Sequence, residues 1–327
     1  MLLADFVLQR GGWVCGAVLD SSMTVRHIVT RDRNMVDAMR GSKYVQSEVA
    51  CALGECLAHL RDGDEVFFTG TACQVDAMRS LAGNALSDRL LTADVLCHGA
   101  PSPAFWQAYL DYRGSCEGAV VTGARFRKKT PSWTVFSMEL IFGSGVKRAW
   151  PCDEDLYLRA FLGDYITRDA CHICPYTGTG RVSDVTLADF WGYVSESRKD
   201  RNTEKGISLV LANTSEGACA IEAIAKRTYI VEKPLSEAVR GNVPLRRPFK
   251  ANPKAEEFWE AFDDGGVEAV RSTFLGKKKP SKKHLLSLWF NDHAYLLPTF
   301  VRRRVVNWMC VCVCARACGG GEGRYYH

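Results

Sequence analysis

The sequence predicts an α/β fold, a mixed sheet flanked by helices, with a helical C-terminal extension. Short apolar runs typical of strands alternate with helix-length segments. Twice, an apolar strand leads through a turn of small residues into a new helix, which is the pattern of a βα unit. The 327 residues can build a large core, and 47% hydrophobic and 24% charged residues are ordinary for a globular protein. No run of eighteen apolar residues occurs, so no membrane-spanning helix is predicted.

The first sixty residues predict a helix, a pair of strands and two further helices. Gly11 and Gly12 separate the first helix from the strands, and Asn34 is the predicted cap of the second helix. Because the chain starts directly in a regular element, we expect that a further segment usually precedes it. The predicted ranges are 4–9, 34–40 and 48–60 for helices and 13–19 and 24–29 for strands.

Two successive βα units cover residues 65–81 and 90–112. In the first, the strand ends in a turn that contains Cys73; in the second, the strand ends at Cys97 and Ser102 caps the next helix. The N-terminus of a helix attracts anions and favours the thiolate form of a cysteine, so ligands bind at such turns. If the two strands are parallel, both cysteines lie on one edge of the sheet. For each cysteine taken singly, a buried structural thiol is the alternative.

A strand rich in cations follows the second unit. Residues 119–129 contain Arg125, Arg127, Lys128 and Lys129. These cations could face an anionic cofactor or substrate, or they could lie on a solvent-exposed edge of the sheet. The residues alone do not distinguish these two interpretations. The elements predicted after it are strands at 134–142, 146–150, 185–187 and 206–212 and helices at 153–162, 214–227 and 254–274.

A Cys-x-x-Cys motif at Cys171 and Cys174 is the strongest candidate for chemistry. Its spacing lets two thiolates converge on one metal while the intervening amides turn around it. The motif alone does not distinguish thiol redox chemistry, zinc and iron–sulfur. The chain has fourteen cysteines and no secretory signal. This combination predicts a cytoplasmic location with free or metal-bound thiols rather than a disulfide framework.

A polar loop at residues 41–47 is a second candidate. Lys43 supplies a cation, Tyr44 supplies an aromatic ring, and hydroxyl and amide groups surround them. Such a loop can hold a phosphate and stack a planar ring. A solvated connection is the plainer alternative.

The chain beyond residue 250 predicts a helical, basic and cysteine-rich extension over residues 251–327. Residues 277–283 are typical of an exposed linker, and residues 285–313 alternate between apolar and basic groups. Their cysteines suit a metal site or a lipid anchor, but an unpacked tail is the favoured interpretation. These cysteines are Cys310, Cys312, Cys314 and Cys318.

Seven short motifs stand between residues 41 and 192. They are Gly-Ser-Lys-Tyr-Val-Gln-Ser at 41–47, Thr-Gly-Thr-Ala-Cys-Gln at 69–74, Cys-His-Gly-Ala-Pro-Ser-Pro at 97–103, Phe-Arg-Lys-Lys at 126–129 with Trp133, Cys171 with Cys174, Arg181 with Ser183 and Asp184, and Asp-Phe-Trp-Gly at 189–192. As an ordered set over roughly residues 5 to 250, they resemble the coenzyme F-420 hydrogenase/dehydrogenase beta subunit family, which includes chlorophyllide hydroxymethyl reductases. The family usually has a further segment upstream, and Ala72 replaces its usual proline.

The resemblance implies an iron–sulfur flavoprotein oxidoreductase that passes electrons between a [4Fe–4S] cluster, FAD and a partner. It implies four cluster ligands, which are Cys73, Cys97, Cys171 and Cys174. It implies FAD contacts from the polar loop, the two βα turns and the basic strand, namely Ser42, Lys43, Tyr44, Gln46, Ser47, Thr69, Gly70, Thr71, Gln74, His98, Arg127 and Lys129. The expected partner is a ferredoxin-like protein, a deazaflavin or another small molecule.

The choice of metal stays open at this point. Four thiolates satisfy zinc as well as an iron–sulfur cluster, so the ligand count does not decide. The alternative is therefore a zinc-stabilised binding module, or a non-catalytic family member that acts as a scaffold in polysaccharide biosynthesis. A nucleic-acid binder is disfavoured, because the basic clusters lie in linkers and the aromatic residues lie in strands.

Overall fold

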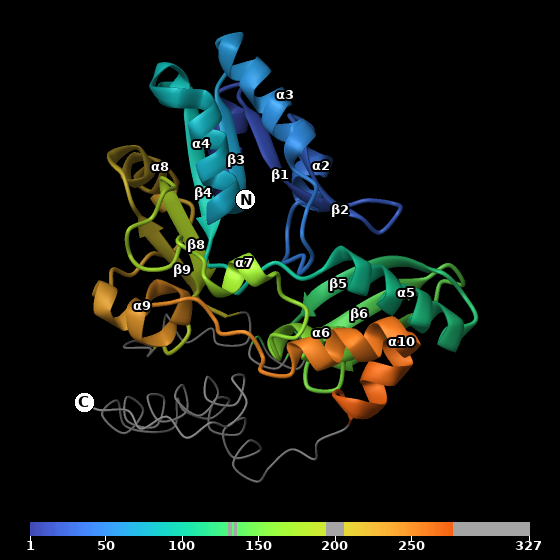
Figure 1. Cartoon of the computed structure of the whole chain (residues 1–327). Helices are drawn as coiled ribbons and strands as arrows, with labels where there is room; N and C mark the ends of the chain where they lie inside the picture. The colour runs from blue at the N-terminus through green and yellow to red at the C-terminus, as the bar shows by residue number, and fades with distance from the viewer. Residues whose placement is uncertain (130–132, 134–135, 194–205, 277–327) are drawn as a thin grey trace.

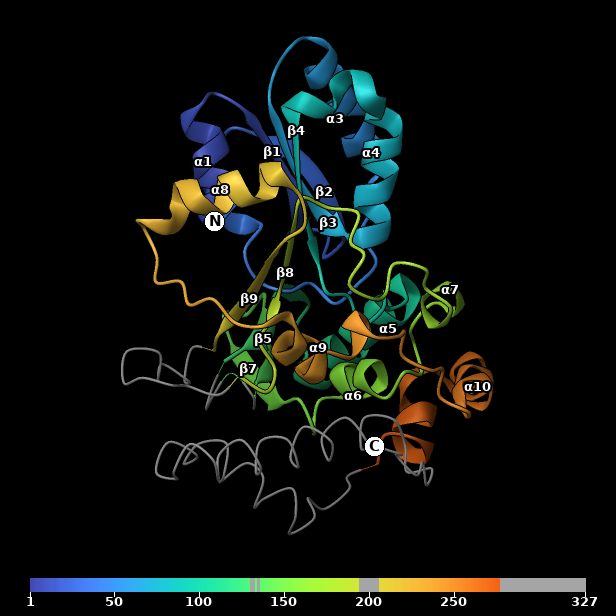
Figure 2. The same ribbon diagram turned by 90° about the vertical axis from the view of Figure 1, so that its left-hand side faces the viewer.

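A computed structural model describes residues 1–129, 133, 136–193 and 206–276, which form two sheets with helices around them (Figures 1 and 2). In this part of the chain the larger sheet has the strand order β2-β1-β3-β4-β8-β9, and the smaller sheet has the order β5-β6-β7. The predicted α/β class, a mixed sheet flanked by helices, is therefore confirmed. The cysteine-rich tail at 310–318 lies outside the described residues.

Four parallel strands form the centre of the larger sheet, and one antiparallel strand closes each edge. The strands are β1 (Trp13–Leu19), β2 (Val25–Thr30), β3 (Val66–Thr71), β4 (Leu90–Val95), β8 (Val185–Asp189) and β9 (Ser208–Ala212). A parallel strand that is covered on both faces needs a continuous apolar run rather than alternation. The Val-Phe-Phe run that begins β3 meets this requirement, and all three side chains are buried.

Helices cover both faces of the larger sheet (Figure 2). α1 (Leu2–Gln9) and α8 (Ser215–Ala225) pack on one face, and α3 (Ala50–Arg61) and α4 (Ala72–Leu86) pack on the other. The helices therefore bury both apolar surfaces of the central strands. None of the helices in the described part of the chain is both long and apolar enough to cross a membrane.

The cap of α2 (Arg33–Ala38) and the presence of a helix before α10 (Ala255–Thr273) differ from the sequence prediction. The cap of α2 is Asp32 rather than Asn34, because the Asp32 carboxylate accepts a hydrogen bond from the Asn34 N–H at 2.7 Å. A further helix, α9 (Leu235–Gly241), was not predicted. It is a short helix in which only Ala238 is buried, so the sequence carries no apolar periodicity to indicate it.

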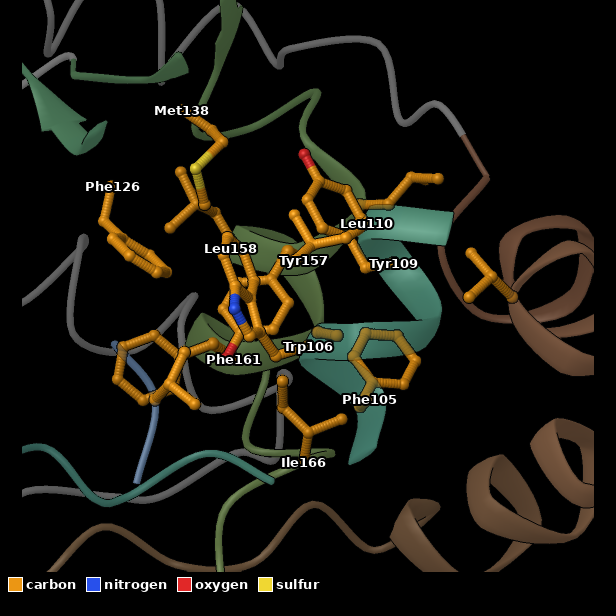
Figure 3. Packing of buried hydrophobic residues seen from close by; sticks show 14 of the residues in the cluster. Phe105, Trp106, Tyr109, Leu110, Phe126, Met138, Tyr157, Leu158, Phe161 and Ile166 are labelled. Atoms are coloured by element: carbon orange, nitrogen blue, oxygen red, sulfur yellow. The ribbon is translucent and has the colours of Figure 1, made fainter. Parts of the chain in front are cut away.

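The smaller sheet is antiparallel and packs with three helices around an aromatic core (Figure 3). Its elements are β5 (Val121–Lys128), β6 (Ser137–Phe142), β7 (Lys147–Pro151), α5 (Pro103–Glu117), α6 (Leu156–Leu162) and α10 (Ala255–Thr273). Trp106 and Tyr157 meet edge to face with ring centroids 5.0 Å apart. The Trp106 indole N–H donates to the Met23 carbonyl at 2.8 Å, which ties α5 to the turn between β1 and β2.

α10 belongs to this aromatic core. Phe258 of α10 is fully buried, and its ring centroid lies 5.5 Å from that of Phe105 of α5. Full burial of a phenylalanine contributes about 1.5–3 kcal/mol. The start of the predicted extension beyond residue 250 therefore packs against α5, and its remainder from residue 277 lies outside the described residues.

Asp155 is a fully buried carboxylate in the same region. It accepts hydrogen bonds from the Tyr109 hydroxyl at 2.6 Å and from the Leu158 N–H at 2.9 Å, and it pairs with Arg113 at 3.2 Å. Burial raises the pKa of Asp155, and its three partners act in the opposite direction. The carboxylate thereby caps α6 and connects it to α5.

Replacing Asp155 with alanine is expected to lower the free energy of unfolding by about 3–5 kcal/mol, because the buried Tyr109 hydroxyl and the partly buried Arg113 then lose their shared carboxylate partner. Glu117→Ala is the control, since it breaks a surface pair with the exposed Arg148 and should change the stability much less. Urea unfolding of both variants gives the comparison. Equal costs for the two substitutions would contradict the importance of the buried pair.

Candidate functional site

The carboxyl edge of the larger sheet brings Cys73 and Cys97 to equivalent positions. β3 and β4 are parallel, and their last registered pair is Thr71 with Val95. Each cysteine follows the end of its strand by two residues. The sequence prediction required the two strands to be parallel, and the structure shows that they are. Both cysteines therefore lie at the same edge of the sheet.

Cys73 lies in the first turn of α4, where a capping box orders the backbone. The Gln74 side-chain oxygen accepts a hydrogen bond from the Thr71 N–H at 2.9 Å, and its amide nitrogen donates to the Ser47 hydroxyl at 2.9 Å. A Cβ at Gly70 would lie 2.9 Å from the same Gln74 oxygen, so the turn favours glycine there. Cys73 itself is exposed, with its Sγ 3.1 Å from the Thr71 hydroxyl.

Gly99 allows the turn after β4 to approach the segment that carries Cys171. Its φ is +153°, and a Cβ there would lie 2.2 Å from Thr167 Cγ2. The next residue, Ala100, donates its N–H to Cys171 Sγ at 3.4 Å. An antiparallel bridge between Pro101 and Thr167 holds the two segments together.

Arg181 anchors the loop of residues 171–176, the cysteine loop, to the larger sheet. α7 (Asp169–His172) is a single turn, and the chain continues through Cys174 to Tyr176. Arg181 donates to the Tyr176 carbonyl at 2.5 Å and forms an ion pair with Asp94 of β4, in which neither side chain is more than 2% exposed. Burial raises the pKa of Asp94, and the Arg181 charge opposes this effect.

Cys73, Cys171 and Cys174 lie close enough to Cys97 to raise its pKa. The pKa of Cys97 rises to about 12, first through burial, then through the Cys171 thiolate and more weakly through Cys73 and Cys174. The pKa of Cys171 is also raised, mainly by burial, with Cys73 and Cys174 adding to the effect. Three segments that are far apart in the sequence therefore bring the four cysteines into one neighbourhood.

A single ion and a four-iron cluster place different demands on these thiols. Within the described residues, no three His, Cys, Asp or Glu side chains converge closely enough to hold a metal ion. Zinc bonds of about 2.3 Å would bring the sulfurs to about 3.8 Å from one another, whereas a four-iron cluster spreads its thiolates over separate irons. The Thr167 hydroxyl is buried and has no partner in the described part of the chain. Such hydroxyl donors, and N–H groups like that of Ala100, suit the sulfurs of a cluster.

The predicted flavin loop runs along the same edge. The Gln46 N–H donates to the Pro101 carbonyl at 3.0 Å, and Ser47 accepts from Gln74. These bonds join the loop to both cysteine-bearing turns. Ser42, at the start of the loop, is exposed.

Lys43 faces the C-terminal end of α2. Its ammonium nitrogen lies 3.0–3.4 Å from the carbonyl oxygens of residues 38–41. Burial lowers the pKa of Lys43 to about 8. The side chain therefore has internal partners in addition to the phosphate contact that the resemblance implies.

A row of aromatic rings connects Tyr44 with the turn that carries Cys97. The rings of Tyr44 and His98 both pack against Phe161, and their centroids lie 5.0 Å and 4.9 Å from the Phe161 centroid. His98 also stacks on Phe249 at 3.8 Å, and its Nε2 is hydrogen-bonded to Asp164 at 2.8 Å. Two of the predicted flavin contacts therefore belong to one rigid aromatic row beside the cysteines.

Two other predicted FAD contacts, Arg127 and Thr69, have hydrogen-bond or ion-pair partners within the fold. Arg127 pairs with Asp189 at the end of β8 and donates to the Trp133 carbonyl at 3.1 Å. The Thr69 hydroxyl donates to the Cys15 carbonyl at 3.0 Å inside the sheet. Lys129 is exposed just after β5. The structure therefore gives Arg127 and Thr69 structural partners and does not place them against the thiols.

Three residues of the site carry no sequence signal. Asp164, Thr167 and Phe249 belong to none of the motifs, yet they contact His98 or the Gly99 turn. Only Asp164 shows a local peculiarity, a φ of +57°. Such single residues become part of a site through long-range packing, which a local pattern does not encode.

This geometry defines an α/β protein with four cysteines gathered at the carboxyl edge of its sheet. A family model that describes the C terminus of the beta subunit of coenzyme F420 hydrogenase/dehydrogenase matches residues 63–238, more than half of the chain. The chain therefore belongs to the coenzyme F420 hydrogenase/dehydrogenase beta subunit family, as its motifs predict.

Among solved structures, the chain is similar to a chain of the xenon-derivatized F420-reducing [NiFe] hydrogenase complex from Methanosarcina barkeri. The two are 17% identical with a TM-score of 0.50, and the match covers 81% of this chain and 85% of the other. At this level of identity the similarity shows a shared fold. No curated protein matches the chain.

Gly99→Ala is expected to destabilise the protein by at least about 1–3 kcal/mol, because the backbone conformation is strained for any other residue and the methyl group would overlap Thr167. Gly54→Ala is the matched control. Gly54 lies in α3 with nothing within 4 Å of an added Cβ, so the change should stabilise by about 0.8–1 kcal/mol. Thermal unfolding measures both, and a Gly99→Ala protein as stable as the parent would rule out the close approach.

Proposed function

We propose that this protein is an oxidoreductase subunit that holds a [4Fe–4S] cluster through Cys73, Cys97, Cys171 and Cys174. The observation that carries the proposal is the gathering of these thiols at one sheet edge, where the other three raise the pKa of Cys97. Metal ligation favours the thiolate, so a bound cluster offsets the burial and repulsion that disfavour the Cys97 thiolate in the apoprotein. The F420-reducing hydrogenase neighbour supports the same class of activity.

We further propose FAD as the companion cofactor. The residues that would hold it are the loop at 42–47, the capped turn at 69–74, His98 and the basic strand with Arg127 and Lys129. Two observations support this assignment: the loop bonds to both cysteine turns, and Tyr44 and His98 belong to one aromatic row. FAD and the cluster, when bound, would supply two-electron and one-electron chemistry.

The residues of the chain would position and shield these groups. Asp164 fixes the ring of His98 through its hydrogen bond, and Phe249 covers one face of that ring. The Asp94–Arg181 pair holds the cysteine loop against β4. The electron partner in this proposal is a ferredoxin-like protein, a deazaflavin or another small molecule, and the compartment is the reducing cytoplasm.

Anaerobic purification followed by iron, sulfide, zinc and flavin analysis tests the proposal. The expected result is about four irons and four sulfides per chain after reconstitution, as a cluster of this type requires. Protein that contains zinc but takes up no iron would instead establish the zinc-stabilised alternative.

Cys171→Ser is expected to abolish the broad visible absorbance of the cluster and to destabilise the surrounding loop, because ligation energy is also folding energy. Cys219→Ser and Cys116→Ser are the controls, since both cysteines are exposed on helices outside the site. Iron and sulfide are measured on all three reconstituted proteins. Full iron and sulfide in Cys171→Ser would show that the ligand assignment is wrong.

Lys43→Ala is expected to weaken FAD binding roughly ten- to a hundredfold without changing iron content, because a hydrogen bond to a charged group contributes about 1.5–3 kcal/mol. The pKa of Lys43 is about 8, so the ammonium loses its charge as the pH rises through that value. FAD affinity of the parent should therefore fall as the pH rises beyond about 8, and the variant should lack this dependence.

Lys147→Ala, at an exposed position of β7, is the control for the loss of a cation. FAD binding is followed by fluorescence quenching at sub-saturating FAD between pH 7 and pH 10, with thermal unfolding of each variant alongside. Equal FAD affinity of Lys43→Ala and the parent at pH 7 would reduce residues 42–47 to a structural loop.

A further inference from the structure

An exposed apolar side chain stands between two of the four cysteines. Ile173, flanked by Cys171 and Cys174, is 81% exposed, and Pro175 beyond them is exposed as well. A single exposed isoleucine is ordinary on a protein surface. Ile173 is notable for its position between Cys171 and Cys174. A protein that makes an apolar contact with it would lie directly against the cysteine loop.

A basic segment runs beside this loop and is fixed to it at two points. The Pro244 carbonyl accepts a hydrogen bond from the Gly178 N–H at 2.8 Å, and the Phe249 carbonyl is bonded to His172 Nδ1 at 3.0 Å. Arg246 and Arg247 lie between these two points and are exposed. The backbone between α9 and α10 therefore runs beside the cysteine loop (Figure 1), and Arg246 and Arg247 belong to this stretch.

The charges of the two segments have one predominant sign. Residues 168–178 and 244–250 contain four exposed cations and one exposed carboxylate, Asp169. The cations are Arg168, Arg246, Arg247 and Lys250. Within the described residues none of the four forms an ion pair with a carboxylate. Unpaired surface cations produce a positive field that attracts and orients an acidic partner.

We propose that this face, made of Arg168, Ile173, Pro175, Arg246, Arg247 and Lys250, is the docking surface for an acidic electron-carrier protein. It has the composition of a transient interface, a small apolar centre within a charged rim. Charge complementarity selects an acidic partner, and the position over the cysteine loop selects an electron carrier. The choice of an electron carrier rests on the proposed function, whereas the docking itself requires only the folded chain.

The test uses an acidic plant-type [2Fe–2S] ferredoxin as the probe and the full chain as the target. Binding is measured by titration calorimetry at low and at high salt. The double variant Arg246→Glu/Arg247→Glu is expected to bind at least about tenfold more weakly at low salt and to lose most of the salt dependence, because rim charges govern both. Ile173→Ser is expected to weaken binding at both salt concentrations, since it removes the apolar contact.

Lys147→Glu/Lys226→Glu is the matched control, with the same change in net charge at two exposed cations, one in β7 and one directly after α8. It should retain the affinity of the parent. Equal loss in both double variants would attribute binding to overall charge and overturn the docking surface, as would unchanged binding by Arg246→Glu/Arg247→Glu. Iron analysis of the same samples separates the two proposals: a protein that binds the ferredoxin but takes up no iron retains the surface and loses the cluster.

Discussion

The buried ion pair between Asp94 and Arg181 is the interaction on which the arrangement of the site depends. Asp94 belongs to a central strand, and Arg181 follows the cysteine loop and also holds the Tyr176 carbonyl. One Asp94 oxygen has no hydrogen-bond partner within the described residues, so desolvation of this pair is only partly compensated. A buried pair of this kind contributes little net stability, but it specifies one position for the loop. Its role is therefore to set the register between Cys174 and the edge of the sheet.

The gathering of thiols works against ionisation of Cys97 in the apoprotein. Burial and mutual repulsion raise the pKa of Cys97 to about 12, so its thiolate is strongly disfavoured without a cation nearby. Metal ligation requires the thiolates, and binding therefore releases protons and strengthens as the pH rises. The Ala100 N–H, which is directed at Cys171, is already in place to stabilise a negative sulfur. The edge thus keeps Cys97 neutral until a bound cation favours its thiolate.

The sequence predicted the sheet and the cysteine edge because both follow from local patterns. The apolar runs and small-residue turns around Cys73 and Cys97 require only the parallel pairing that the strands then adopt. The sequence did not predict the contact of Gly99 with Thr167, because it joins residues nearly seventy positions apart through one backbone conformation. For the same reason the aromatic row from Tyr44 to Phe249 was unexpected: its members are single residues from four segments.

Lys43 shows why a residue type in a motif does not by itself determine a role. An ammonium group has three N–H donors, and four carbonyl oxygens at the end of α2 already lie within 3.4 Å of it. A phosphate that binds Lys43 must therefore displace at least one of these carbonyls. The phosphate contact is the stronger of the two, since donor and acceptor are both charged there, whereas a carbonyl is a neutral acceptor. Flavin binding in the proposed site is consequently coupled to the C-terminal end of α2, which would lose part of its cap as the phosphate is bound.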